Sequence, residues 1–199
     1  MSENSALGLI LVISGPSGVG KDTVWKAASA CLPSFERAVT CTTRERRPHE
    51  VKGRDYHFVS HAEFERMIRE DELIEYAQVH GNFYGVPQKS VLDRINNSDD
   101  VVCVIDVQGA LRIRRLFPNA LLVFIKPPQG RETAVLEERI QGRSAVDASE
   151  LATRLETASW ELSQTEHYDY QIENDEIERA SSELCDVIRR EKAQRLGTS

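Results

Sequence analysis

The sequence lacks the features that mark membrane, secreted and nucleic-acid-binding proteins. Its first apolar run, Leu7 to Ile13, is too short to span a bilayer and has no lysine or arginine before it, unlike a signal peptide. The formal net charge is −7, which argues against wholesale binding to nucleic acid or to a membrane surface. We therefore expect a cytoplasmic protein that binds neither partner.

Cysteine is scarce, and its spacing carries no metal or disulfide signature. Cys31, Cys41, Cys103 and Cys185 form no C-x-x-C pair. We expect small buried or semi-buried thiols in a reducing compartment, rather than zinc ligands or disulfides.

Internal repeats and low-complexity tracts are also absent. With 199 residues, 40% of them hydrophobic and 29% charged, the chain suits one globular domain with room for small inserted lobes.

A glycine-rich stretch, GPSGVGKDT at residues 15–23, provides the first chemical signal. Up to Lys21 it fits the phosphate-loop pattern G-x-x-x-x-G-K, in which backbone N–H groups surround phosphate oxygens and the lysine reaches the outer phosphates. An apolar run at 9–13 predicts a buried strand before the loop, and residues 22–32 predict a helix after it. This context indicates a nucleotide-phosphate loop made up of Gly15, Pro16, Ser17, Gly18, Val19, Gly20, Lys21, Asp22 and Thr23.

The residue after the loop lysine departs from the pattern. A serine or threonine that ligates Mg²⁺ is usual there, whereas this chain has Asp22 and brings the hydroxyl one place later, at Thr23. One hypothesis is that Asp22 contacts Mg²⁺ directly or through water while Thr23 bonds the α-phosphate. The other is that Asp22 only stabilises the helix N-terminus. The sequence leaves both open.

A second buried-strand pattern, at 101–105, stops at Asp106. The carboxyl end of such a strand faces the crevice in which α/β proteins bind ligands, and an aspartate there can hold Mg²⁺. The alternative is that Asp106 merely caps the next helix. Because a phosphate loop is also present, we favour the metal-linked role.

Three arginines form a third candidate element. Arg139 and Arg143 are four residues apart, on one face if the helix extends that far, and Arg154 comes from the next helix. Arginines that close over a phosphoryl group stabilise the charge on its equatorial oxygens during transfer. Spacing alone equally allows solvated side chains that pair with nearby glutamates.

Apolar strands alternate with helical patterns along most of the chain, which predicts an open, mostly parallel α/β sheet flanked by helices. Beyond those above, strands are expected at 37–43, 55–59, 120–125 and 168–172, with a hairpin at 73–79 and 83–86. Helices are expected at 61–70, 87–95, 108–116, 133–140, 148–162 and 176–195. The interval 40–87 breaks the alternation and indicates an inserted lobe.

The inserted interval concentrates residues suited to an anionic ligand. Arg44 and Arg47 bracket a turn, and guanidinium groups bind phosphate through two parallel hydrogen bonds. Tyr56, Glu75 and Tyr84 follow in the same interval. Each has a structural alternative as a surface or packing residue, but together they favour a ligand site.

Five motifs in this order resemble those of guanylate kinases: GPSGVGK, TTRERRPHEVKGRDYHFV, EYAQVHGNFYG, IDVQGA and YDYQIEND. They cover about residues 8–193, and the second and third are highly specific to this group. The resemblance implies a P-loop NTPase core with two mobile lobes and Mg²⁺-dependent phosphoryl transfer from ATP to GMP, by a monomer or homodimer. It divides the chain into a core (1–39, 93–130 and 158–199), an α+β GMP-binding lobe (40–92) and a helical lid (131–157).

The resemblance also implies roles for single residues. The GMP-binding positions are Thr40, Arg44, Arg47, Tyr56, Glu75, Tyr84 and Asp106. The catalytic positions are Lys21, Arg44, Arg139, Arg143 and Arg154. Asn174 matches a position near the ATP adenine, and Asp22 and Asp106 are the metal candidates. Glu75 matches the residue that reads guanine, whose N1–H and 2-amino groups are donors that adenine lacks.

Some positions depart from the family. Val86 and Val104 stand where many members have polar or acidic residues near the nucleotide, and Ser144 replaces a common glycine. A ribose 1,5-bisphosphate kinase also has aspartate after the loop lysine, but it has no need of the base-reading Glu75. Non-catalytic guanylate kinase-like interaction modules have degraded phosphate loops, whereas Lys21 and the loop glycines are intact here.

Overall fold

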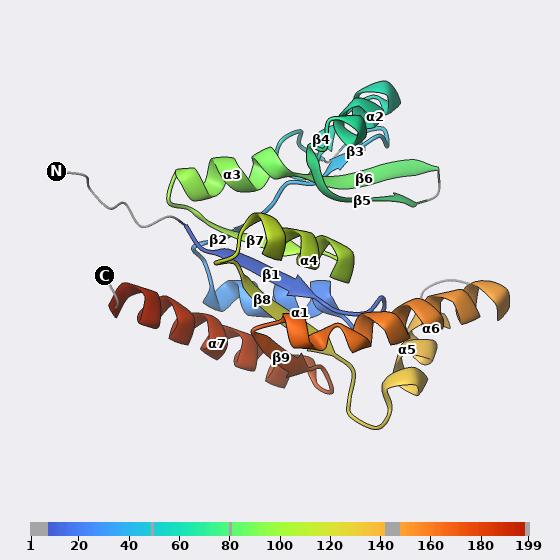
Figure 1. Ribbon diagram of the computed structural model, residues 1–199, viewed down its shortest axis with the longest axis vertical. Coiled ribbons are helices and arrows are strands. Elements are labelled where there is room, and N and C mark those ends of the chain that lie inside the picture. The colour runs from blue at the N-terminus through green and yellow to red at the C-terminus, as the bar shows by residue number, and fades with distance from the viewer. Residues whose placement is uncertain (1–7, 49, 80, 142–147, 198–199) are drawn as a thin grey trace.

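A parallel five-stranded sheet forms the centre of the computed structural model, which describes residues 8–48, 50–79, 81–141 and 148–197 (Figure 1). The strand order is β2-β7-β1-β8-β9, and every neighbouring pair is parallel. The predicted mostly parallel α/β sheet is therefore confirmed. The strands are β1 (Ile10–Ser14), β2 (Phe35–Arg37), β7 (Asp100–Val104), β8 (Leu121–Lys126) and β9 (Tyr170–Glu173).

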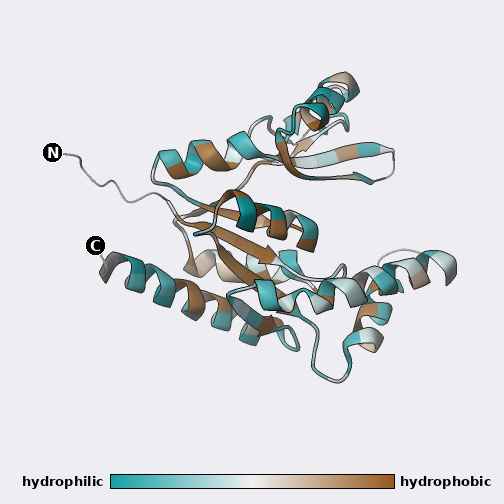
Figure 2. Cartoon of the chain, in the orientation of Figure 1, coloured by the Kyte–Doolittle hydropathy of each residue, from teal (hydrophilic) through white to brown (hydrophobic). Residues whose placement is uncertain are grey.

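Alternate residues of β1 enter two hydrophobic cores, one on each face of the sheet. Leu11 and Ile13 pack with α1 (Lys21–Ala28) and α7 (Ile177–Gly197), while Ile10 and Val12 pack with α3 (Gln88–Asn96) and α4 (Val107–Leu116). Figure 2 shows the apolar strands in brown between helices whose outer faces are largely teal. Since burial of one such side chain stabilises the fold by about 1.5–3 kcal/mol, this two-sided core holds the ends of the strands in place.

A second sheet, of order β4-β3-β6-β5, stands apart at the top of Figure 1. Its elements are β3 (Cys41–Thr42), β4 (His57–Phe58), α2 (His61–Arg69), β5 (Leu73–Val79) and β6 (Asn82–Pro87). It has its own small core around Phe64, Met67 and Leu73. The single strand predicted at 37–43 is wrong, because the chain leaves the central sheet after β2 and joins this second sheet at β3. Ala38 N still bonds Val102 O, whereas Thr43 N bonds Phe83 O.

Two of the proposed lobe boundaries can be compared with the helices of the structure. The boundary at 92/93 falls within α3, whose Val91 and Ile95 pack in the core on one face of the central sheet. The segment 131–157 covers α5 (Glu132–Gln141) and most of α6 (Ala148–Ser163), which lie together at one end of the molecule (Figure 1). The division into core, lobe and lid stays a prediction.

The expectation of four free thiols is wrong. Cys31 and Cys185 form a disulfide between the short 3₁₀ helix η1 (Ser29–Cys31) and α7, while Cys41 and Cys103 are free and buried. The two bonded residues are 154 positions apart, but α1 and α7 pack side by side and bring their Cα atoms to 6.5 Å, within the usual range for a disulfide. Among the described residues, no helix combines the length and apolar character needed to cross a membrane.

Candidate active site

The glycine loop lies between β1 and α1, as the sequence predicts. A Cβ on Gly15 would lie 2.1 Å from the carbonyl oxygen of Ile125 on β8, so only glycine lets the loop leave the sheet here. Gly20 begins α1 with φ of 99°, a left-handed conformation that other residues adopt at a cost. The loop therefore presents its N–H groups at a helix N-terminus, the arrangement that binds anions.

Lys21 turns back over the loop. Its Nζ donates to the carbonyl oxygens of Gly15 at 2.6 Å and Pro16 at 3.2 Å. Burial lowers the pKa of Lys21, and the surrounding carboxylates, first Glu161 and then Asp106, oppose that shift. The lysine is thus an enclosed cation within a group of acids.

Glu161, from α6, is a site residue that sequence reasoning missed. Its side chain is buried, and Oε2 accepts a hydrogen bond from the loop residue Ser17 N at 3.4 Å. Burial raises the pKa of Glu161, while the charge of Lys21 partly offsets that rise. A signal was available, since Glu161 shares the inward face of α6 with the buried Ala158, and a charge on an apolar helix face is unusual.

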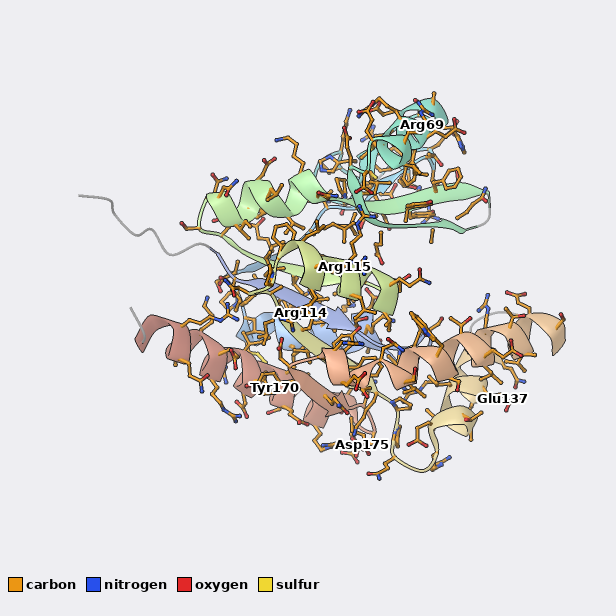
Figure 3. The ribbon with its side chains drawn as sticks, in the orientation of Figure 1. Arg69, Arg114, Arg115, Glu137, Tyr170 and Asp175 are labelled. Atoms are coloured by element: carbon orange, nitrogen blue, oxygen red, sulfur yellow. A yellow bond between two sulfur atoms is a disulfide. The ribbon has the colours of Figure 1, made fainter. Side chains whose placement is uncertain are left out.

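Two predicted residues hold the middle of the loop. Arg139, from α5, donates to Val19 O at 2.8 Å and to Asn174 O at 3.3 Å. The Asn174 side chain is buried and donates through Nδ2 to Val19 O at 2.7 Å, while its Oδ1 has no hydrogen-bond partner among the described residues. Glu137, which Figure 3 labels on α5, does not pair with Arg139. It accepts a hydrogen bond from Gln141 on the same helix at 3.4 Å.

Asp22 and Thr23 lie outside this enclosed group. Asp22 is 70% exposed at its side chain and pairs with Arg37 of β2 at 2.7 Å. Thr23 is exposed in the first turn of α1. The structure thus gives Asp22 a contact that neither hypothesis included, and its role stays open.

Arg44, Tyr56 and Tyr84 form one cluster beside the second sheet, while the described contact of Arg47 is through its backbone N–H. Arg44 lies over the ring of Tyr56, with 5.5 Å from the guanidinium carbon to the ring centroid, and the rings of Tyr56 and Tyr84 are 6.1 Å apart. Glu50, which sequence reasoning did not single out, is buried and fixes this turn. Its carboxylate accepts from Arg44 Nη2 at 2.5 Å and from Arg47 N at 2.8 Å.

Glu75 and Asp106 meet where the second sheet approaches the core. The β5–β6 pairing shifts register between Leu73 and Glu75, and such bulges redirect side chains. Glu75 Oε2 accepts from Asp106 N at 3.2 Å, and Asp106 caps α4 by accepting from Gly109 N at 2.8 Å. Burial raises the pKa of Glu75 well above its ordinary value, and the negative charge of Asp106 adds to that rise.

A cavity of about 250 Å³ connects the phosphate loop to the second sheet. Five predicted residues line it together with Val104: Lys21, Thr40, Glu75, Tyr84 and Asp106. A larger cavity of about 800 Å³, lined by residues of α2, β4 and α3, contains none of the predicted residues. The smaller cavity therefore brings Lys21, predicted to bind the ATP phosphates, together with residues predicted to bind GMP.

For two of the predicted arginines, Arg154 and Arg143, the structure shows no contact with this cavity. Arg154 pairs with Glu150, one turn earlier on α6. Arg143, like Ser144, lies outside the described residues.

A phosphate-binding loop that faces an arginine- and tyrosine-bearing lobe across a cavity defines a phosphotransferase of the P-loop nucleotide-kinase class. The family model for guanylate kinase matches residues 8–191, so the chain belongs to the guanylate kinase family. Its guanylate kinase homologues are nucleoside monophosphate kinases. The family expected from the sequence motifs is confirmed.

Individual relatives agree with this assignment. The chain is 42% identical over 190 residues to the guanylate kinase of Clostridium acetobutylicum, covering 96% of this chain and 89% of that protein. It is 45% identical to the guanylate kinase of Gloeobacter violaceus, covering 87% and 83% of the two chains. The crystal structure of guanylate kinase from Anaplasma phagocytophilum is similar, with a TM-score of 0.65 and 33% identity over 94% of this chain and 87% of that one.

Proposed function

We propose that this protein transfers the γ-phosphoryl group of ATP to GMP, giving ADP and GDP. A phosphate oxygen of GMP forms a bond to the γ-phosphorus, and the bond from that phosphorus to the β–γ bridging oxygen breaks, so that ADP leaves with the electron pair. The observation that carries this proposal is the cavity shared by Lys21 and Glu75. Because the GMP phosphate is largely ionised at neutral pH, the reaction needs alignment and charge neutralisation rather than a general base.

Glu75 reads the guanine in this proposal. Its ionised carboxylate accepts from N1–H and from the 2-amino group, whereas adenine would leave a desolvated carboxylate without donors. Thr40 lies in the same cavity, which supports a second contact with the base. Arg44, Arg47, Tyr56 and Tyr84 hold the GMP phosphate.

The donor nucleotide lies along the glycine loop. Loop N–H groups and Lys21 hold the ATP phosphates, and Asn174 contacts the adenine. The buried Oδ1 of Asn174, an acceptor with no partner among the described residues, supports that contact because the adenine amino group is a donor. Arg139 lies against the loop already, and Arg143 and Arg154 approach the phosphates when the lid, residues 131–157, closes and excludes water.

The residues present fit a Mg²⁺ ion that is held largely by the nucleotide phosphates. Such ions need only one or two carboxylates, and no group of three His, Cys, Asp or Glu side chains suited to a metal occurs among the described residues. Asp106 lies in the cavity with Lys21 and meets this need, whereas Asp22 faces Arg37. When bound, Mg²⁺ neutralises phosphate charge.

A steady-state survey of acceptors tests the proposal. With ATP and Mg²⁺, the acceptors are GMP, dGMP, AMP, UMP and ribose 1,5-bisphosphate, and ADP release is measured. We expect GMP to be preferred strongly over AMP and UMP. Preference for ribose 1,5-bisphosphate, or no turnover of any acceptor together with no ATP binding by calorimetry, would contradict the proposal.

A further inference from the structure

The first turn of α4 leaves no room for a side chain at Gly109. A Cβ built on this residue would lie 2.5 Å from Glu75 Oε2 and 3.0 Å from both Cβ and Cδ of Glu75. Contacts between such atoms are ordinary only from about 3.5 Å. The space that a side chain would fill is therefore occupied by the side chain of Glu75, on β5.

The backbone gives no reason for a glycine at this position. Gly109 is the third residue of α4 and does not have the left-handed φ found at Gly15 or Gly20. In a helix, alanine is favoured over glycine. The hydrogen bond from Gly109 N to Asp106 Oδ1, at 2.8 Å, needs only a backbone N–H, which alanine also has. The missing Cβ, rather than backbone freedom, is what Gly109 contributes.

Glu75 Oε2, the atom closest to the Cβ built on Gly109, is also the oxygen that accepts a hydrogen bond. Oε2 accepts from Asp106 N at 3.2 Å, directly before α4. Gly109 and the Asp106 amide thus act on the same oxygen from neighbouring positions of one turn. Displacing Oε2 from Gly109 would also take it from the amide, and would turn the carboxylate within the cavity.

We propose that Gly109 is a positioning residue for guanine recognition. Its missing side chain lets the Glu75 carboxylate lie against the first turn of α4, and this fixes the direction in which Glu75 faces the acceptor base. This inference rests on the proposed function, because it concerns the residue that reads GMP there. Gly109 itself touches no substrate.

The test is Gly109→Ala, with Leu116→Ala as the control at an exposed position in the last turn of the same helix. We expect kcat/KM for GMP to fall about tenfold or more, mainly through KM, as when a buried charge-assisted hydrogen bond is misaligned. KM for ATP should not change, and the thermal midpoint of the variant should stay within a few degrees of wild type. Leu116→Ala should leave both KM values unchanged.

A double-mutant cycle separates positioning from a general packing effect. In a Glu75→Ala background the contacts with Oε2 and Cδ are absent and only the 3.0 Å approach to the Cβ at position 75 remains. Adding Gly109→Ala there should therefore lower kcat/KM for GMP far less than in the wild-type background. This double variant also keeps the test decisive if Gly109→Ala alone fails to fold. An equal loss of GMP activity in both backgrounds, or no loss in either, overturns the inference.

Assays of the wild-type protein separate failure of the proposed function from failure of the positioning role of Gly109. Absence of GMP turnover by the wild-type protein contradicts the proposed function itself. Normal GMP turnover by both the wild type and Gly109→Ala contradicts only the positioning role.

Discussion

Replacing Glu161 by glutamine tests what the buried carboxylate beside the loop does. Glutamine keeps the size and the acceptor for Ser17 N, and it removes only the charge. Burial raises the pKa of Glu161 above its ordinary value of 4.5, and Lys21 offsets only part of that rise. Because the folded-state pKa exceeds the unfolded one, ionised Glu161 costs stability. That cost is absent below about pH 4.5 and complete once the pH exceeds the folded-state pKa.

The expected result is that Glu161→Gln is more stable than wild type at pH 7 and that the difference shrinks toward pH 4. Each unit by which the pKa is raised corresponds to about 1.4 kcal/mol of unfolding free energy at neutral pH. Urea denaturation at both pH values measures the difference. Glu156→Gln, an exposed change on the same helix with the same change in net charge, is the control and should have little effect.

ATP binding provides the functional half of the same experiment. The Glu161 carboxylate and an ATP phosphate bound at the loop would repel each other. For two unit charges about 6 Å apart the repulsion is roughly 3 kcal/mol at an effective dielectric of about 20, and screening by salt and Lys21 reduces it to about 1 kcal/mol. Calorimetry without Mg²⁺ should therefore show ATP binding about fivefold tighter to Glu161→Gln than to wild type. A variant that is less stable at pH 7 and binds ATP more weakly would show that the carboxylate supports both the loop and the nucleotide, and would refute this reasoning.

Three other predictions follow from the site. Only the ionised Glu75 carboxylate can accept from both guanine donors, and burial raises the pKa of Glu75, so KM for GMP should already increase as the pH falls toward 4.5. Glu75→Gln, which leaves the titration of the GMP phosphate intact, should make KM for GMP depend less on pH. Glu50→Gln loosens its charge-assisted bond to Arg44 and should raise KM for GMP several-fold without changing KM for ATP, whereas the exposed Glu45→Gln should change neither. Thiol titration of the unfolded, unreduced chain should find two thiols, and four after reduction, because one disulfide is present; four without reduction would contradict it.

The parts of the fold that depend on local pattern could be predicted from the sequence. The strand at Ile10–Ser14, the glycine loop and the following helix appear where the apolar run and the glycines indicate. The error at 37–43 has a physical cause. Two short strands separated by three residues look like one strand in sequence, and only tertiary pairing with β7 or β6 tells them apart.

Two of the residues that sequence reasoning missed act across long separations, whereas Glu50 is only six positions from its partner Arg44. Glu161 is 144 positions from Ser17, and Gly109 is 34 positions from the Glu75 side chain that fills its space. Glycine is common near turns, so Gly109 does not stand out until the chain is folded. Glu161 has only the weak signal of a charge on an apolar helix face, which does not show that its partner is the glycine loop. The disulfide between Cys31 and Cys185 was hidden for the same reason, since its half-cystines meet only when α7 packs on α1.

Electrostatics give a physical reason for the proposed phosphate-binding arginines in an otherwise acidic protein. Four carboxylates act on the enclosed Lys21, namely those of Glu161, Asp106, Asp22 and Glu75. The proposed reaction then brings two anionic nucleotides into this group, and one lysine does not balance that charge. Arg44, which pairs with the Glu50 carboxylate, and Arg139, which donates to the Val19 carbonyl, place one cation in each half of the proposed site. Val104, which lines the cavity without charge, avoids a further carboxylate between the two nucleotides.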